Sequence, residues 1–437
     1  MEVLTNVIRE GVTAFHTVSY VKQELLQKGF QEWKYGEPWQ VEQGKNYVIT
    51  PYPTVLVAVS VGKLTPDFGV RLAVAHTDSP CLKIKCNPEL PGKYYVRMNV
   101  EPYGGLIKQT WFDRPLGIAG KLVLKGKDVF HPEIRYIASG RGICIIPSLA
   151  PHLSKGEEKK EMDIQREMMP IAGLYDMGNS ASANCEGEEK GQDFLVNYLE
   201  QQWEISREEL LDYDLYLYNV EEPEEVGLQG EFISAPRIDN LASVAALLET
   251  MEGLVGETHG NLAVAAMFDN EEIGSRSKQG ADSVLLQQML EKLGMELGFE
   301  SSKWKDKLSK GFLLSMDGAH GFHPNYPDKS DPTNPVYLGK GPVIKTSASQ
   351  RYLSDSEATG IIKELCHYAG IQCQQQVNRS GMPGGQTLGP ILSSYLPMMG
   401  ADVGIPMLAM HSAREMAAWE DYRELKELVE AFYQYKK

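Results

Sequence analysis

The segment NLAVAAMFDNEEIGSRS, residues 261–277, joins an uncharged run to two adjacent acidic residues, and it decides how the rest of the chain is interpreted. Residues 262–268 are apolar throughout and have the length of a buried strand. Glu271 and Glu272 follow directly, and a buried carboxylate is unfavourable unless it is paired or binds a metal. The two glutamates therefore form either a hydrated turn that leads into Gly274 or part of an active site.

Helices and strands alternate on both sides of this segment. Strand-like runs occupy residues 47–49, 54–61, 69–75, 311–316 and 372–377. Apolar residues spaced three and four apart predict helices over residues 5–28, 241–251, 283–293, 356–368 and 413–435. This alternation predicts an α/β fold, in which a layered sheet is flanked by helices.

A stretch of different character interrupts this alternation. Between residues 92 and 226, short strand-like runs broken by Gly, Pro and Asp occur at 94–100, 121–124, 133–137 and 142–146. Residues 154–202 are polar and acidic, which is typical of a surface loop, and we expect one amphipathic helix within them. We therefore predict two domains: a discontinuous α/β domain, residues 1–90 and 233–437, and an inserted β-rich domain, residues 91–232.

The composition limits the possible partners and the cellular compartment. The 437 residues include 43 Lys and Arg against 59 Asp and Glu, a net charge of −16, which disfavours nucleic acid and membrane surfaces as partners. The N-terminus lacks a basic segment followed by an apolar one, and no stretch of about 18 residues is apolar without charge. The six cysteines form no C-x-x-C pair, so we expect a reduced, cytoplasmic protein.

Acidic residues and histidines follow several apolar segments. In open α/β sheets the carboxyl ends of the strands converge on a ligand crevice, so these side chains could meet at one place. Two imidazoles and several carboxylates suit Zn²⁺, Co²⁺ or Mn²⁺. The residues concerned are His76, Asp78, Asp239, Glu271, Glu272, Asp317 and His411.

Each of these residues also has a plain structural interpretation. A single histidine after a strand can be an ordinary core or surface residue, Asp239 can cap the following helix, and Asp317 with Gly318 is a common turn pair. Glu271 and Glu272 point in different directions if they end a strand. One of them can then bind a metal while the other acts as a general base, and the residues alone leave open which does which.

Longer motifs narrow these alternatives. They are AHTDSPCLKIK (75–85), VEPYGGLIKQTWFDRPLGIAGKLVLK (100–125), PRIDNLAS (236–243), FDNEEIGSRSKQGA (268–281), HPNYPDKS (323–330), GKGPVIKTSASQRY (339–352) and LAMHSAREM (408–416). Together they resemble the aspartyl aminopeptidase family of dinuclear zinc metallopeptidases. The resemblance begins in the N-terminal segment FHTVSYVKQELLQKGF (15–30) and covers nearly the whole chain.

The resemblance implies a fold and an assembly. The fold is a phosphorylase/zinc-peptidase-like αβα sandwich with an inserted β-rich dimerisation domain. In this family dimers assemble into a tetrahedral dodecamer, so the resemblance implies a homo-oligomer. It also implies two divalent metal ions per subunit, zinc in the first place, with cobalt or manganese as alternatives.

The resemblance also assigns the metal ligands. His76 and Asp317 would complete the site of one ion, and Glu272 and His411 the site of the other. Asp239 would bridge the two ions.

Three further residues match catalytic positions of the family. Glu271 would be the general base, and Asp78 would orient His76. His152, in the segment IIPSLAPHL (145–153), would reach the active site of a neighbouring subunit. Oligomerisation would then be part of catalysis.

The substrate pocket is expected to contain His323, Lys345 and Gly385, where a cation would suit an acidic N-terminal residue. A turn histidine and a solvated lysine at a strand edge are the alternative interpretations. The segment RSGMPGGQTLGPI, residues 379–391, departs from the family pattern, and so does the acidic insertion near 154–200. The first departure bears on acidic selectivity, and the second on assembly contacts or on access to the inner chamber.

The function implied is that of a metal-dependent aminopeptidase, which releases N-terminal Asp or Glu from short peptides by attack of an activated water. One alternative is a related aminopeptidase with broad or neutral specificity, or a deacylase on the same scaffold. Another is a catalytically silent oligomeric shell that binds other proteins. An unliganded base at Glu271 argues against a silent shell, because such a shell needs no base beside its metal.

Overall fold

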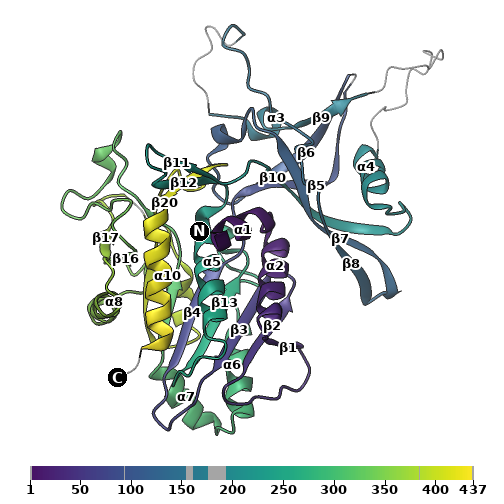
Figure 1. Ribbon diagram of the computed structural model, residues 1–437. Helices are drawn as coiled ribbons and strands as arrows, with labels where there is room; N and C mark the ends of the chain where they lie inside the picture. The colour runs from purple at the N-terminus through teal and green to yellow at the C-terminus, as the bar shows by residue number, and fades with distance from the viewer. Residues whose placement is uncertain (1, 93, 154–160, 176–192, 383, 436–437) are drawn as a thin grey trace, which may run out of the picture. The chain divides into compact units, whose positions relative to one another are not determined.

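The computed structural model describes residues 2–92, 94–153, 161–175, 193–382 and 384–435. The chain divides into two compact units (Figure 1): Met1–Ser79 with Glu222–Lys437, and Pro80–Glu221. Both boundaries lie earlier in the chain than the expected domain limits. The reason is strand pairing, because β5 (Cys81–Leu90) pairs inside the second unit and β12 (Phe232–Ala235) pairs inside the first.

A nine-stranded sheet forms the centre of the first unit. Its strands lie in the order β1-β2-β3-β13-β4-β14-β18-β16-β17. Their bounds are β1 (Gln31–Trp33), β2 (Asn46–Tyr52), β3 (Val55–Val61), β4 (Val70–His76), β13 (Leu262–Phe268), β14 (Phe312–Met316), β16 (Val343–Thr346), β17 (Gln374–Val377) and β18 (Met399–Gly404). β4 runs parallel to both β13 and β14, with Phe268 opposite His76. The carboxyl ends of these three strands therefore point the same way.

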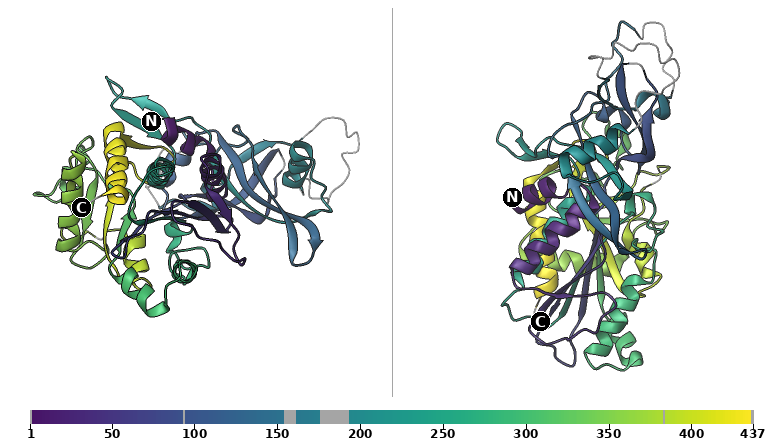
Figure 2. Two further views of the ribbon diagram at one scale, coloured as in Figure 1. Left: turned by 60° about the horizontal axis from the view of Figure 1, so that its bottom comes forward. Right: turned by 90° about the vertical axis from the view of Figure 1, so that its right-hand side faces the viewer.

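Helices cover both faces of this sheet. Their bounds are α1 (Glu2–Glu10), α2 (Ala14–Gln27), α5 (Ile238–Gly253), α6 (Leu285–Glu296), α7 (Ser301–Ser309), α8 (Ser356–Ala369), α9 (Leu388–Ser393) and α10 (Trp419–Gln434). Successive side chains of a strand point to opposite faces of the sheet, so the sheet separates two hydrophobic cores. Ala263 and Ala265 pack with α1, α2, α5, α8 and α10, whereas Leu262 and Val264 pack with α6, α7 and α9. Figure 2 shows the purple and yellow helices on one side of the sheet and the green α6 and α7 on the other.

A smaller five-stranded sheet also belongs to the first unit, and the loop between two of its strands carries His411. Its order is β11-β12-β20-β19-β15. Besides β12, its strands are β11 (Glu224–Val226), β15 (Ala319–His320), β19 (Pro406–Leu408) and β20 (Glu415–Ala418). Ala235 of β12 lies opposite Glu415 of β20, which places the chain leading into α5 next to the start of β20.

The second unit is built on a six-stranded antiparallel sheet in the order β8-β7-β10-β5-β6-β9. Besides β5, its strands are β6 (Tyr95–Tyr103), β7 (Leu116–Asp128), β8 (His131–Ala138), β9 (Ile171–Leu174) and β10 (Leu210–Asn219), and its helices are α3 (Ile164–Glu167) and α4 (Phe194–Trp203). Three short 3₁₀ helices complete the secondary structure of the described residues: η1 (Lys108–Trp111) in this unit, and η2 (Glu271–Ile273) and η3 (Pro327–Lys329) in the first. Part of the acidic insertion, residues 154–160 and 176–192, lies outside the described residues.

The predicted fold class, an α/β domain interrupted by a β-rich module, is confirmed. Three local predictions are wrong. The helix expected over residues 5–28 is two helices, and the break falls at Gly11, where a Cβ atom would lie 2.5 Å from the carbonyl oxygen of Val7. Residues 142–146 form only isolated bridges, and the first part of the expected closing helix, residues 413–435, contains strand β20. No helix within the described part of the chain is long and apolar enough to cross a membrane.

Candidate metal centre

The residues expected to bind metal follow the carboxyl ends of neighbouring strands in the first unit. His76 ends β4, Glu272 lies in η2 after β13, and Asp317 follows β14. Asp239 lies in the first turn of α5, with non-helical backbone angles (φ −77°, ψ 108°), and His411 lies in the loop between β19 and β20. Parallel pairing of β4 with β13 and β14 aligns their ends, so residues far apart in sequence meet at one edge of the sheet.

The ligand atoms form three overlapping groups, and the atoms within each group lie within 4.8 Å of one another. These groups are His76, Asp239 and Asp317; Asp239, Glu272 and His411; and His76, Glu271 and Glu272. Nε2 of His76 lies 3.4 Å from Oδ1 of both Asp239 and Asp317. Nε2 of His411 lies 3.3 Å from Oε2 of Glu272. Two atoms that share one tetrahedral zinc ion are roughly 3.4 Å apart, so these spacings fit a metal ion between the partners.

Two buried carboxylate oxygens at this place accept no hydrogen bond from the described residues: Oδ1 of Asp239 and Oε1 of Glu272. Unpaired buried oxygens of this kind are costly, and a cation would satisfy them. Burial, followed by the negative charge of Asp239, raises the pKa of Glu272 well above its ordinary value. Burial is also the largest cause that raises the pKa of Glu271 to about 8. The residues present therefore fit divalent metal ions.

The imidazole of His76 lies among three carboxylates. Burial disfavours its charged form, yet the nearby carboxylates of Asp239, Asp317 and Asp78 raise its pKa well above the ordinary value. Asp239 shows the reverse effect, because the two neighbouring imidazoles, those of His411 and His76, outweigh its burial and hold its pKa far below the usual range. In this arrangement Asp239 remains ionised between two imidazoles.

Asp78 holds the loop that carries both glutamates. Its Oδ1 and Oδ2 atoms accept the backbone N–H groups of Glu271 and Glu272, each at 3.2 Å. Nδ1 of His76 lies 3.0 Å from the backbone oxygen of Asp78 and 3.4 Å from its Oδ1. These contacts join Asp78 both to the η2 loop and to the His76 ring, and its role in orienting that ring stays a prediction.

Glu415 is absent from the residues that the sequence predicts for this site, and it lies in the segment 413–435 that is predicted as helix. Its side chain is buried, and its two oxygens accept the backbone N–H groups of His411 at 2.7 Å and Asp239 at 2.9 Å. Burial, followed by the charge of Asp239, raises the pKa of this carboxyl to about 8. The signal that could have identified it is its position four residues after His411 in the motif HSARE.

Lys345 is buried rather than solvated, so the alternative interpretation as a surface lysine is wrong. Its Nζ atom donates to Oδ2 of Asp317 at 3.1 Å and to the backbone oxygen of Gly318 at 2.9 Å. Burial opposes its charge, but the carboxylates of Asp317 and Asp402 raise its pKa. Lys345 thus contacts one oxygen of Asp317, while the other oxygen faces His76.

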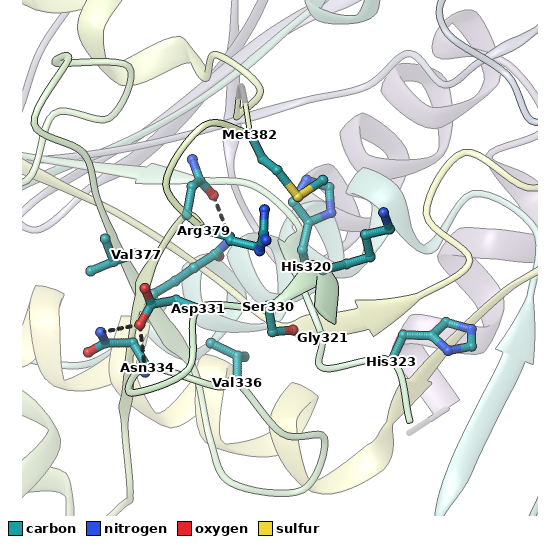
Figure 3. A pocket seen from close by; sticks show the side chains of 13 residues that line it. His320, Gly321, His323, Ser330, Asp331, Asn334, Val336, Val377, Arg379 and Met382 are labelled. Atoms are coloured by element: carbon teal, nitrogen blue, oxygen red, sulfur yellow. Dashed lines mark hydrogen bonds between the residues drawn. The ribbon is translucent and has the colours of Figure 1, made fainter. Parts of the chain in front are cut away.

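A pocket of about 290 Å³ lies in the same unit. It is lined by the cations Lys329 and Arg379, by the imidazoles of His320 and His323, and by Val336, Val377 and Met382. Figure 3 shows His320, Arg379 and Met382 on one side of this space, with His323 set apart from them. Burial, followed by the charge of Lys345, lowers the pKa of His320. The charges of Asp239, Asp317 and His411 also act on this ring, so this side of the pocket lies near the proposed metal ligands.

The charge of this pocket is positive on balance. Asp331 is its one carboxylate, and the N–H groups of Thr333 and Asn334 donate to Oδ1 of Asp331, each at 3.0 Å. Among the described residues, Arg379 forms no ion pair. The sequence predicted His323 here but missed His320, which lies only three residues after Asp317.

Two predicted residues lie elsewhere. Gly385 is exposed and is not among the residues that line this pocket. His152 is exposed on the second unit, and its place at a neighbouring subunit's site stays a prediction.

Comparison with known proteins agrees with this geometry. The model of the family described as aminopeptidase I zinc metalloprotease (M18) matches residues 7–433. The chain is 39% identical over 437 residues to a probable M18 family aminopeptidase 2 of Clostridium novyi, covering 98% of this chain and 97% of the relative. It is 34% identical over 432 residues to the protein of the same name from Pseudomonas aeruginosa, with 98% and 97% covered.

A solved structure is similar over almost the entire chain. The cryo-electron microscopy structure of the Ape4 and Nbr1 complex contains a chain that is 31% identical, with a TM-score of 0.91, covering 99% of this chain and 84% of the other. The fold, the clustered His, Asp and Glu residues, and the family match therefore lead to the same conclusion. This chain belongs to the M18 family of zinc metalloproteases and is a metallo-aminopeptidase.

Proposed function

We propose that this aminopeptidase uses two divalent ions and prefers acidic N-terminal residues. The observation that carries the two-ion part is the sharing of Asp239 between two ligand groups, one with His76 and Asp317 and one with Glu272 and His411. A carboxylate with one oxygen toward each group is the arrangement expected of a bridging ligand. His76 and Asp317 would hold one ion, and Glu272 and His411 the other.

Bound ions supply a Lewis acid that acidifies a water molecule and polarises the peptide carbonyl group. In our proposal Glu271 takes the proton from this water and delivers it to the leaving amine. Its ligand atom lies within 4.8 Å of those of His76 and Glu272, which is close enough for a general base. The same closeness makes Glu271 a candidate ligand, so its role has to be tested against that of Glu272.

The pocket supports the acidic preference. The cations Lys329 and Arg379 line it together with two imidazoles that can donate hydrogen bonds, and Asp331, the one carboxylate among its described lining residues, is held by hydrogen bonds. A charge-assisted hydrogen bond to a substrate carboxylate contributes about 1.5–3 kcal/mol, which corresponds to roughly a tenfold to hundredfold preference. Lys345 would act behind Asp317 rather than in the pocket, because it is buried.

We also propose that the protein is a cytoplasmic homo-oligomer built from dimers, of which a dodecamer is the expected form. Exposed apolar side chains in the second unit support an interface there. Val129 and Phe130 at the turn between β7 and β8 are 91% and 89% exposed, and Leu153 beside His152 is 71% exposed. In such an assembly His152 would complete the active site of a neighbouring subunit and help stabilise the oxyanion.

The proposal is tested with purified full-length protein that is stripped of metal and reloaded at defined free Zn²⁺, Co²⁺ or Mn²⁺. Elemental analysis should find two ions per chain at saturation. Dipeptides that begin with Asp, Glu, Leu and Lys are then compared by kcat/KM. We expect the Asp and Glu dipeptides to be cleaved at least about tenfold faster than the others.

An N-acetylated aspartyl peptide is the matched control, and it should not be cleaved because an aminopeptidase needs the free α-amino group. Faster cleavage of the leucyl peptide would overturn the acidic preference and favour an enzyme of neutral specificity. Hydrolysis of none of the peptides would instead favour a silent binding shell.

A further inference from the structure

The carboxylate of Glu415 joins two segments that are distant in sequence. Glu415 is the first residue of β20, opposite Ala235 of β12, and its side chain is almost completely buried. Oε1 accepts the N–H of His411 at 2.7 Å, and Oε2 accepts the N–H of Asp239 at 2.9 Å. One buried carboxylate thus holds the main chain at both residues.

For both N–H groups the acceptor is the Glu415 side chain rather than a backbone carbonyl of a helix or strand. Asp239 lies in the first turn of α5, where backbone N–H groups have no acceptor within the helix. His411 lies in a loop and has a positive φ of 67°, which is uncommon for a residue with a side chain. Buried N–H groups need an acceptor, and Glu415 supplies one oxygen to each.

We propose that Glu415 is a positioning residue of the metal centre, which fixes the distance between the Asp239 and His411 main chains and so places these two ligands for one ion. This inference rests on the proposed two-ion function. Glu415 belongs to none of the ligand groups of the described residues, and each of its oxygens faces a backbone N–H group, so we place it outside the ligands of both ions. Asp78 performs the same task for Glu271 and Glu272 on the other side of the cluster.

The ionised carboxylate suits this task because it offers two acceptors at a fixed spacing and no donor. The backbone N–H groups of Asp239 and His411 favour this ionised form, against the burial that raises the pKa of Glu415. In Glu415→Gln one position becomes an NH₂ group, which repels one of the two N–H groups and frees the segment that carries it. The second ion should then be bound less tightly, even though every ligand is still present.

Asp421 provides a matched control. Its buried carboxylate accepts the N–H groups of Gly339 at 2.7 Å and Gly341 at 2.8 Å. This is the same bonding pattern on a loop that carries no proposed ligand. Asp421→Asn therefore removes a comparable pair of buried hydrogen bonds from the fold, but it should leave the metal centre intact.

The experiment measures Zn²⁺ affinity in full-length wild type, Glu415→Gln and Asp421→Asn by competition with a chelator, and records the visible spectrum of each after Co²⁺ loading. We expect a 10- to 100-fold loss of affinity for one ion in Glu415→Gln, which is the usual effect of removing a partner of a metal ligand. A changed cobalt spectrum should accompany this loss. Asp421→Asn should bind both ions as the wild type does.

Wild-type affinity and spectrum in Glu415→Gln would overturn the inference, and so would an equal loss in Asp421→Asn. If Glu415→Gln does not fold, hydrogen exchange in the wild type still decides. The N–H groups of Asp239 and His411, resolved by mass spectrometry with electron-transfer fragmentation, should exchange as slowly as those of neighbouring strands, and fast exchange would contradict the proposed contact. Failure of the wild type to bind two ions would count against the proposed function itself. This outcome is therefore distinct from a failure of the inference about Glu415.

Discussion

Nε2 of His411 lies 3.6 Å from Oδ2 of Asp239, and this carboxylate turns its other oxygen toward a second imidazole, that of His76. One ligand group contains His76 and Asp317, and another contains Glu272 and His411. Asp239 is the only residue that belongs to both groups. The two proposed ion sites therefore depend on one side chain.

Asp239→Ala should lower the metal content from two ions per chain to nearly none, because both sites lose a ligand. His76→Ala and His411→Ala should each weaken mainly one ion. Elemental analysis after dialysis at fixed free Zn²⁺ measures these contents. Retention of two ions by Asp239→Ala would remove its bridging role.

The two adjacent glutamates should behave differently when each is changed to glutamine. Glu271→Gln removes the proposed base, so we expect kcat to fall by about 10²–10⁴-fold while both ions stay bound. Glu272→Gln removes a proposed ligand, so we expect weaker binding of one ion. Parallel measurements of hydrolysis and metal content separate the roles, and metal loss in Glu271→Gln with retention in Glu272→Gln would mean that the assignments are exchanged.

The central sheet and the position of the cluster could be predicted from sequence because the signals are local. The apolar run at 262–268 is β13 with the same bounds, and the residues that follow strands β4, β13 and β14 come together at the sheet edge. The ligand assignment itself needed the resemblance to a family, since spacing alone did not distinguish Glu271 from Glu272.

The residues that support the cluster could not be predicted, because their roles depend on long-range pairing. Glu415 reaches Asp239 only because β20 pairs with β12, and the apolar spacing around it also fits a helix. The burial of Lys345 depends on Asp317 and Asp402, which lie on other strands or loops. His320 and His323 are close in sequence, and only the structure shows that both line one pocket.

Arg379 should contribute to the choice of substrate. It lines the pocket and forms no ion pair with any residue that the structure describes, so its charge is available to a substrate carboxylate. Arg379→Met should lower kcat/KM for aspartyl and glutamyl dipeptides by about tenfold or more, with little change for leucyl dipeptides. Arg351→Met is a suitable control, because Arg351 is a nearby exposed arginine that donates to the backbone oxygen of Gly384. An equal loss for all substrates in Arg379→Met would exclude a role in selectivity.

Lys345→Met should destabilise the metal-free protein more than the metal-loaded protein. Removal of Lys345 leaves the carboxylates of Asp317 and Asp402 without their buried cation, and breaking a buried pair in this way costs about 3–5 kcal/mol. A bound ion at Asp317 would replace part of that charge, so the fall in Tm should be larger in chelator than in Zn²⁺. If Lys345 instead contacts substrate, the variant would raise KM for acidic peptides and leave the Tm unchanged.

Asp421 should make stability depend on pH. Burial is the main cause that raises its pKa from 3.8 to about 7, and the charge of Glu424 adds to this. The folded protein therefore keeps a proton that the unfolded chain has released, so the stability contributed by this group is present below about pH 4 and is lost as pH rises through 7. The change amounts to at most about 4 kcal/mol, at about 1.36 kcal/mol per pKa unit.

Asp421→Asn removes this titration while keeping a similar shape, so the Tm of the wild type minus that of the variant should be larger at pH 5 than at pH 8. Both proteins are measured in chelator, because metal binding at the separate cluster has its own pH dependence. A Tm difference that stays constant between pH 5 and pH 8 would mean that Asp421 is already ionised in the folded protein at pH 5. The N–H groups of Gly339 and Gly341 would then stabilise its charge more strongly than burial opposes it.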